Sequence, residues 1–316
     1  MRKLRSSTKS AKELYPAMSS VLFWGAVASV RVGILASIAA QVAHPFVVDF
    51  ATSLGSDEMT AFFGLCFSVH TAMVILGSVF FWVLDTFGLL QQYKLRRDPA
   101  TPENAPGLMG RAMLFIAAYH MILRFAICRV LWALWPYPSF DGPSPDFSRL
   151  FPHFVVTYWA SELFKYVFHY VQHEVTWLRW MHRPHHEFVQ SQAAASEYSD
   201  MAELSVFTVL SFLHTVQLHP VVHLVTIVWK VSENLEVHSG YCFRGSWLNR
   251  LGLLHSARTE MHDFHHTHPG SRGPYGKPLL FDYIFHTADD WVTFLAKEGR
   301  DPMLSRVMQS EKCSMG

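Results

Sequence analysis

The chain has 316 residues, of which 50% are apolar and only 16% are charged, and its formal net charge at pH 7 is +1. So low a charged fraction, with the apolar residues gathered into long runs, is typical of a membrane protein rather than a soluble one. A net charge near zero provides no basic field, so we exclude a nucleic-acid partner.

Four apolar segments are expected to span the membrane as helices, because each approaches the twenty or so residues that cross a hydrocarbon core of about 30 Å. They cover residues 19–45, 61–89, 110–135 and 151–172. Four basic residues interrupt them, namely Arg31, Arg124, Arg129 and Lys165. Because a charge inside a bilayer is costly unless it faces protein, we expect these helices to pack against one another.

A fifth apolar segment covers residues 203–231 and contains His219-Pro220 near its middle. Proline breaks a helix, and each half is too short to span alone, which predicts a re-entrant helical hairpin. The predicted fold is an all-α integral membrane protein with about four transmembrane helices, this hairpin and a histidine-rich helical cap. Its parts are a basic N-terminus (1–18), the transmembrane helices (19–172), a catalytic region (173–290) and a C-terminal tail (291–316).

The distribution of lysine and arginine predicts the orientation in the membrane. Basic residues are concentrated before residue 13 and again between 94 and 111, whereas the loop around Asp57 and Glu58 has none. Positively charged loops favour the cytosol, so we expect a cytosolic N-terminus. Alternation of the spans then places every residue after about 172, apart from the hairpin, on the cytosolic side.

Nine histidines are the candidate metal ligands, and eight of them form three clusters. One cluster has the spacing H-x-x-x-H and two have H-x-x-H-H. Residues four apart lie on one face of a helix, so the first and last members of each cluster can reach a common metal. The middle histidine of each H-x-x-H-H points aside, toward a second metal. The nine candidates are His169, His173, His182, His185, His186, His238, His262, His265 and His266.

Nine imidazoles are too many for one metal, because a zinc site needs three or four protein ligands, so two metals fit the count. Imidazole accepts iron, zinc or copper, and ligand type alone does not choose among them. The clusters contain no cysteine, which argues against an iron–sulfur cluster. A zinc protease would require H-E-x-x-H, which is absent, and a metal transporter would place its histidines within the spans.

Several stretches around the histidines carry a family likeness. They are LQQYKLRR (90–97), HRPHHEF (182–188), HSGY (238–241), EMHDFHH (260–266) and FDYIFHT (281–287). Together with the order of the clusters, they resemble the fatty acid hydroxylase and sterol desaturase superfamily. Within it, the chain looks most like the C-4 methylsterol oxidases, the methylsterol monooxygenases.

The resemblance implies a monooxygenase that uses dioxygen, with two iron ions held by the nine histidines and no catalytic residue beyond these ligands. It implies electrons from NAD(P)H that arrive through cytochrome b5 and its reductase or a similar donor. It further implies a multi-pass protein of the endoplasmic reticulum membrane. The implied substrate is a membrane lipid, a sterol whose C-4 methyl group is oxidised stepwise to a carboxylate in sterol biosynthesis.

Three positions depart from the sterol pattern: Asp200 replaces a histidine, Met261 replaces a histidine before the last cluster, and His286 replaces a glycine. The sequence does not give the roles of these residues. Because they surround the clusters, two other functions stay open. One is a fatty acyl hydroxylase or desaturase of the same superfamily, and the other is an inactive structural subunit.

Acidic residues beside the clusters are candidates to accept the second N–H group of a ligand imidazole and so to orient its ring. These candidates are Glu187, Glu236, Glu260 and Asp263. His70 and His120 lie within apolar segments, where we expect neutral, hydrogen-bonded packing roles.

Overall fold

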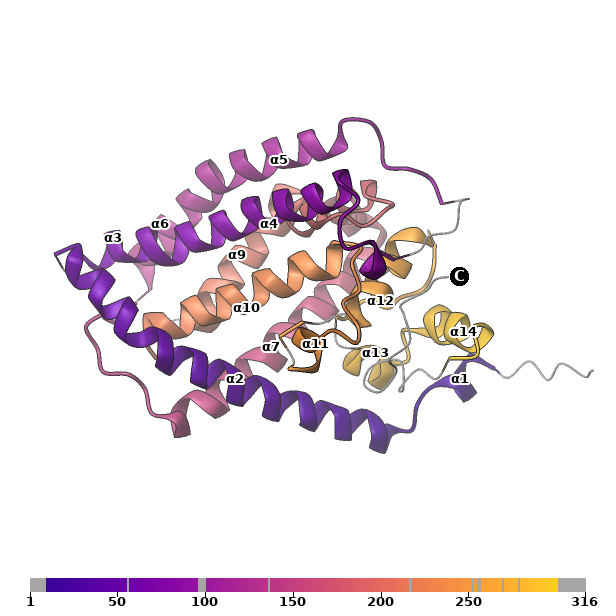
Figure 1. Ribbon diagram of the computed structural model, residues 1–316, viewed down its shortest axis with the longest axis horizontal. Coiled ribbons are helices and arrows are strands. Elements are labelled where there is room, and N and C mark those ends of the chain that lie inside the picture. Colours follow the sequence, from indigo (N-terminus) through magenta and orange to yellow (C-terminus); the bar gives the residue numbers. More distant parts are fainter. Residues whose placement is uncertain are drawn as a thin grey trace, which may run out of the picture.

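The structure is a computed structural model that describes residues 10–55, 57–95, 101–135, 137–215, 218–251, 253–254, 257–268, 270–277 and 279–300. Within these residues the regular elements are helices, joined by one isolated β-bridge between Lys94 and Tyr241. The predicted all-α class is therefore confirmed. The long helices lie roughly along the longest axis of the molecule, and the short ones gather at one end (Figure 1).

Three helices are long and apolar enough to cross a membrane, which matches the first three predicted spans. The first is α2 (Met18–Ser53). The second joins α3 (Glu58–Phe62), η1 (Phe63–Phe67) and α4 (Ser68–Thr86). The third joins α5 (Leu108–Ala118), η3 (Tyr119–Arg124) and α6 (Phe125–Leu134). Both η1 and η3 are π-helical, and such insertions in a helix are frequent at functional sites.

The fourth predicted span lies in α7 (Phe147–Glu174), which packs along α2. By length and apolar composition, α7 is not among the three helices that could cross a membrane within the described residues. It carries Glu162, which is 0% exposed, and Lys165. Its polar side therefore faces protein, and a fourth span remains a prediction.

The fifth apolar segment forms two helices, α9 (Met201–Thr215) and α10 (Pro220–His238), with the predicted break before Pro220. The ring of His219 caps α10, because its Nδ1 accepts a hydrogen bond from the backbone N–H of Val221 at 3.0 Å. Helix α10 is the central helix of the bundle and contacts α2, α4 and α9. It passes α4 closely at Gly77, where a Cβ atom would lie 2.5 Å from the Leu235 side chain.

The short helices form the cap: α8 (Arg179–His182), η5 (His185–Glu187), η6 (Ala193–Glu197), α11 (Trp247–Arg250), α12 (Ala257–Thr267), α13 (Leu280–Phe285) and α14 (Asp289–Lys297). Part of the predicted C-terminal tail is thus the helix α14. Its residues Trp291, Val292 and Leu295 are buried in a second apolar core with Met261 of α12 and Val21 of α2. Residues 301–316 of that prediction lie outside the described residues.

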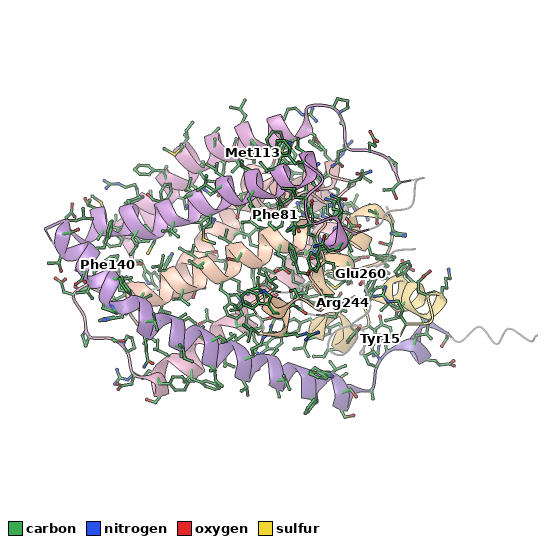
Figure 2. The ribbon with its side chains drawn as sticks, in the orientation of Figure 1. Tyr15, Phe81, Met113, Phe140, Arg244 and Glu260 are labelled. Atoms are coloured by element: carbon green, nitrogen blue, oxygen red, sulfur yellow. The ribbon has the colours of Figure 1, made fainter. Side chains whose placement is uncertain are left out.

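The N-terminal segment lies at the same end of the bundle as the cap (Figure 1). Helix α1 (Ala11–Leu14) packs on α14. The hydroxyl of Tyr15 donates to Asp289 Oδ1 at 2.9 Å and accepts from the backbone N–H of Ala288 at 2.8 Å (Figure 2). The described N-terminal residues and the cap therefore lie at the same end of the bundle, and their side of the membrane remains a prediction.

Replacement of Gly77 by Leu should destabilise the bundle by about 1–3 kcal/mol, because the added side chain overpacks the α4–α10 contact. The control is Gly110→Leu in α5, where a Cβ atom would meet nothing within 4 Å. Melting temperature in mild detergent checks this. Equal melting temperatures for the two variants would contradict the close approach of α4 and α10.

Candidate metal centre

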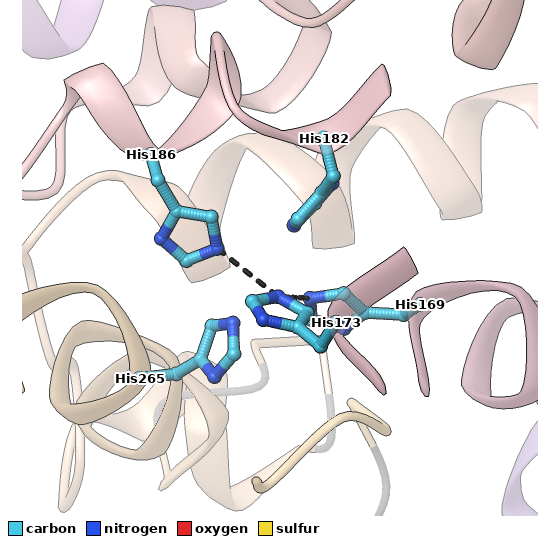
Figure 3. Close-up of side chains that lie close together, drawn as sticks. All are labelled: His169, His173, His182, His186 and His265. Carbon is cyan, nitrogen blue, oxygen red and sulfur yellow. Dashed lines mark hydrogen bonds between the residues drawn. The ribbon is translucent and has the colours of Figure 1, made fainter. Parts of the chain in front are cut away.

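All nine predicted histidines converge at the cap end of the bundle, where α7, α10 and α12 meet the loops of the cap. They form two groups, and within each group the available nitrogen atoms lie within 4.8 Å of one another. The five-histidine group is His169, His173, His182, His186 and His265 (Figure 3). The four-histidine group is His185, His238, His262 and His266.

Helix spacing explains this division. In each H-x-x-H-H cluster the first and last histidines fall in one group and the middle one in the other, as their positions on a helix predict. Adjacent residues of α12 therefore serve different groups: His265 belongs to the five-histidine group and His266 to the four-histidine group. The two groups are consequently held side by side by the same short helices.

Hydrogen bonds at Nδ1 fix the rings of the five-histidine group. His169 Nδ1 lies 2.7 Å from the carbonyl oxygen of Tyr275, and His182 Nδ1 lies 3.1 Å from Glu203 Oε1. A carbonyl oxygen only accepts, so His169 Nδ1 carries the proton and its Nε2 carries a lone pair, and His182 Nδ1 donates in the same way when Glu203 is ionised.

In the four-histidine group, three rings donate a hydrogen bond from Nδ1 to a backbone carbonyl. His185 Nδ1 donates to the carbonyl of Ala195 at 2.9 Å, and His266 Nδ1 donates to the carbonyl of Phe188 at 2.9 Å. His238 Nδ1 donates at 2.7 Å to the carbonyl four residues earlier in α10. The Nε2 lone pairs of these rings again point into the group.

The Nε2 atoms approach one another closely. The His262–His238 separation is 2.8 Å, and the His169–His173 and His173–His186 separations are 3.1 and 3.2 Å. Two such nitrogens share a hydrogen bond when one of them carries a proton, and they can bind one cation when both carry lone pairs. Both ring nitrogens of His265 are buried without a hydrogen-bond partner, so this donor set fits metal ions.

The protonation states agree with this interpretation. Burial lowers the pKa of His185 to about 3, and burial together with the nearby His185 lowers the pKa of His173 to about 4. Burial likewise lowers the pKa of His238, His262 and His265 well below the ordinary value. The imidazoles are therefore neutral at pH 7, which is the form that binds metals.

Two of the four predicted acidic partners have other contacts, whereas Glu236 and Asp263 remain predictions. Glu187 contacts Arg111 at 3.4 Å, and Glu260 pairs with Arg244 and Arg300 (Figure 2), so neither carboxylate orients a ligand histidine. The acceptor is Glu203 instead. The sequence offered one indication of this role, because Glu203 is an acidic residue within an apolar segment, two residues past the start of α9.

Glu203 is held in turn by the Ser199 hydroxyl, which donates to its Oε2 at 2.5 Å. Asp200, where the sterol pattern has histidine, accepts from the backbone N–H of Ala202 at 2.8 Å and so stabilises the first turn of α9. Asp200 therefore helps to place Glu203 rather than binding a metal itself.

The other two departures also have structural explanations. Met261 is 2% exposed and faces the apolar core of the cap, so its side chain does not replace a ligand. His286 ends α13 in the left-handed conformation, with φ 54° and ψ 50°. Glycine adopts this conformation most easily, which explains the glycine of the sterol pattern. The ring of His286 lies 4.6 Å from that of Tyr15.

A third polar cluster contains His70, His120 and Glu197, with the histidine Nε2 atoms 3.5 and 3.8 Å from the carboxylate oxygens. The guanidinium of Arg124 lies 2.9 Å from His70 Nδ1. Because arginine only donates, the proton of the neutral His70 ring is on Nε2 and faces Glu197. Both Nε2 atoms are buried without a hydrogen-bond partner, and the three side chains lie close enough to hold a metal ion as well. We call this cluster the clamp on Glu197, and the predicted packing roles of the two histidines remain a prediction.

The clamp on Glu197 connects two apolar helices to a ligand histidine of the metal centre. Glu197 ends η6, the segment whose Ala195 carbonyl accepts from His185. His70 lies in α4, and His120 lies in the π-helical segment η3. Two of the apolar helices therefore hold the loop that orients a ligand of the four-histidine group.

The comparisons with known proteins agree with this geometry. The family model described as fatty acid hydroxylase matches residues 154–287, which include all nine histidines. A very-long-chain aldehyde decarbonylase of Oryza sativa subsp. indica is 26% identical over 74% of this chain and 88% of its own length. Methylsterol monooxygenase 2-2 of Arabidopsis thaliana is 27% identical over 70% of this chain and 83% of its own length. Cholesterol 25-hydroxylase of Rattus norvegicus is 28% identical over 65% of this chain and 70% of its own length. No solved structure matches the chain significantly.

Replacement of Glu203 by Ala should lower metal affinity about 10- to 100-fold, because His182 loses the acceptor that orients its ring. The matched control is Glu187→Ala, which also removes one carboxylate but one that contacts Arg111. Metal content after dialysis against graded chelator concentrations measures the effect. Equal retention of metal by both variants would refute the orienting role of Glu203.

Proposed function

We propose that this chain is a dioxygen-dependent di-iron monooxygenase of membrane lipids and a member of the fatty acid hydroxylase family, whose model matches residues 154–287. The observation that carries this proposal is the convergence of nine neutral imidazoles in two adjacent groups. Zinc and copper share the preference for imidazole, so the proposal of iron rests on the family. When bound, the two iron ions would supply the activation of dioxygen for oxidation of an unactivated C–H bond.

The residues of this chain have two tasks in that reaction. The nine histidines would hold the ions, and the acceptors at Nδ1 would keep five of the rings in the binding tautomer. These five are His169, His182, His185, His238 and His266. The buried surroundings of the groups would exclude water and hold the lipid in place. Intact imidazoles in all nine positions argue against the inactive structural subunit.

We propose a sterol as the lipid, with its C-4 methyl group as the site of oxidation. The stretches that resemble the methylsterol oxidases support this substrate, as does the match to methylsterol monooxygenase 2-2. A fatty acyl hydroxylase or desaturase remains the other candidate, because the metal site would be the same. The match to a very-long-chain aldehyde decarbonylase, a protein named for another lipid, is a further reason to keep this second candidate.

The proposed location is the endoplasmic reticulum membrane, with the N-terminus and the cap in the cytosol. Electrons from NAD(P)H would arrive there through cytochrome b5 and its reductase or a similar donor. A cavity of about 740 Å³ supports this route, because it reaches His173, His186 and His265 from the cap. Arg179 and Arg272 line the same cavity and would attract an acidic donor.

Replacement of His265 by Ala should remove metal from the five-histidine group and abolish turnover, while membrane insertion stays intact. The control is His268→Ala, which alters an exposed histidine of the same segment that belongs to neither group. Iron and zinc quantification on the purified proteins provides the measurement. Full metal content and turnover in His265→Ala would exclude this site.

Lipid profiling of a strain that lacks the gene tests the substrate. We expect C-4 methylated sterols to accumulate and to disappear again when the wild-type protein, but not His265→Ala, is restored. A normal sterol profile with missing hydroxylated or desaturated fatty acyl chains would instead favour the fatty acyl enzyme.

A further inference from the structure

A cavity of about 70 Å³ lies inside the bundle, between α4, α7, α9 and α10. Much of its wall is apolar, with Phe164, Phe207 and Leu210 among its lining residues, yet Lys165 and Lys230 line it as well. Lys165 precedes His169 by one helical turn on the same face of α7. The cavity therefore adjoins the five-histidine group on the side of the apolar helices.

The two lysines share a single carboxylate. Lys230 forms an ion pair with Glu162, and the ammonium of Lys165 lies 4.0 Å from the same Oε1 atom. Glu233 Oε2 lies 3.8 Å from Lys230, but its Oε1 pairs with Arg258. Among these described residues, three cations face two carboxylates, so one positive charge is in excess.

Neighbouring charged groups do not remove this excess. Glu197 is held by His70 and His120, and Arg124 on the other side of His70 balances its charge. Lys277, on the cap side, contacts the neutral amide of Asn234. A charge in such surroundings is costly unless a partner of opposite sign accompanies it.

We propose that this cavity binds the carboxylate of a lipid, held by Lys165 and Lys230 while the aromatic and aliphatic wall contacts the adjoining hydrocarbon. The inference rests on the proposed lipid oxidation and, of its two candidate substrates, favours the fatty acyl lipid, an anionic amphiphile that carries a carboxylate, over the neutral sterol. A single excess charge and the small volume suit a monoanionic carboxylate better than a phosphate ester. The bound group would lie one helical turn from the histidines, which fixes the depth of the lipid in the bundle.

The test compares two lipids that differ only in their polar end. Full-length, metal-loaded protein in phosphatidylcholine nanodiscs is titrated with radiolabelled palmitate and with hexadecanol. We expect palmitate to bind at least about 10-fold more tightly, because hydrogen bonds to a charged group are worth more than neutral ones. Lys165→Met should abolish this preference, whereas Lys165→Arg should keep it. The control Lys297→Met, at an exposed position of α14, should also keep it.

Two results would overturn the proposal: equal binding of both lipids by the wild-type protein, or an unchanged preference in Lys165→Met. The wild-type comparison needs no variant, so it decides even where Lys165→Met folds poorly. Binding is measured without turnover. A failure here therefore leaves the metal centre and the oxidation untouched, while loss of the proposed oxidation would leave the lipid preference measurable.

Discussion

The donation of Nδ1 protons to fixed oxygen acceptors is the constraint on which the metal centre depends. These acceptors come from separate segments: the loop at Tyr275, the helix α9 at Glu203, the segment η6 at Ala195 and the residue Phe188. The Nε2 lone pairs converge only when all of these segments are in place. Metal bound to the converging nitrogens should therefore stabilise the assembled bundle and cap together.

The apolar helices have a second task besides crossing the membrane. The clamp on Glu197 links α4 and η3 to the loop that orients His185. The ion pairs of Glu162 link α7 to α10 below the five-histidine group. These polar contacts hold the helices in one register beneath the metal centre.

The sequence could predict whatever follows from periodicity. Apolar runs predict the long helices, Pro220 predicts the start of α10, and spacings of four predict which histidines share a metal group. It could not predict the backbone acceptors, because every residue has a carbonyl and only the tertiary fold selects Tyr275 or Ala195. Closeness in sequence also failed to predict the acidic partners. Glu260 is two residues from His262, but its carboxylate pairs with Arg244.

Packing against α12 explains why residues 289–297, part of the predicted C-terminal tail, form the helix α14 in the cap. Every residue from Glu260 to His266 is buried, so α12 has no solvent-facing side along this stretch. Met261 and Phe264 pack into the core that α14 completes, while His265 and His266 serve different metal groups. Rotation of α12 by even part of a turn would move both groups at once. The apolar core of the cap, together with the arginines around Glu260, therefore sets the spacing of the two metal groups.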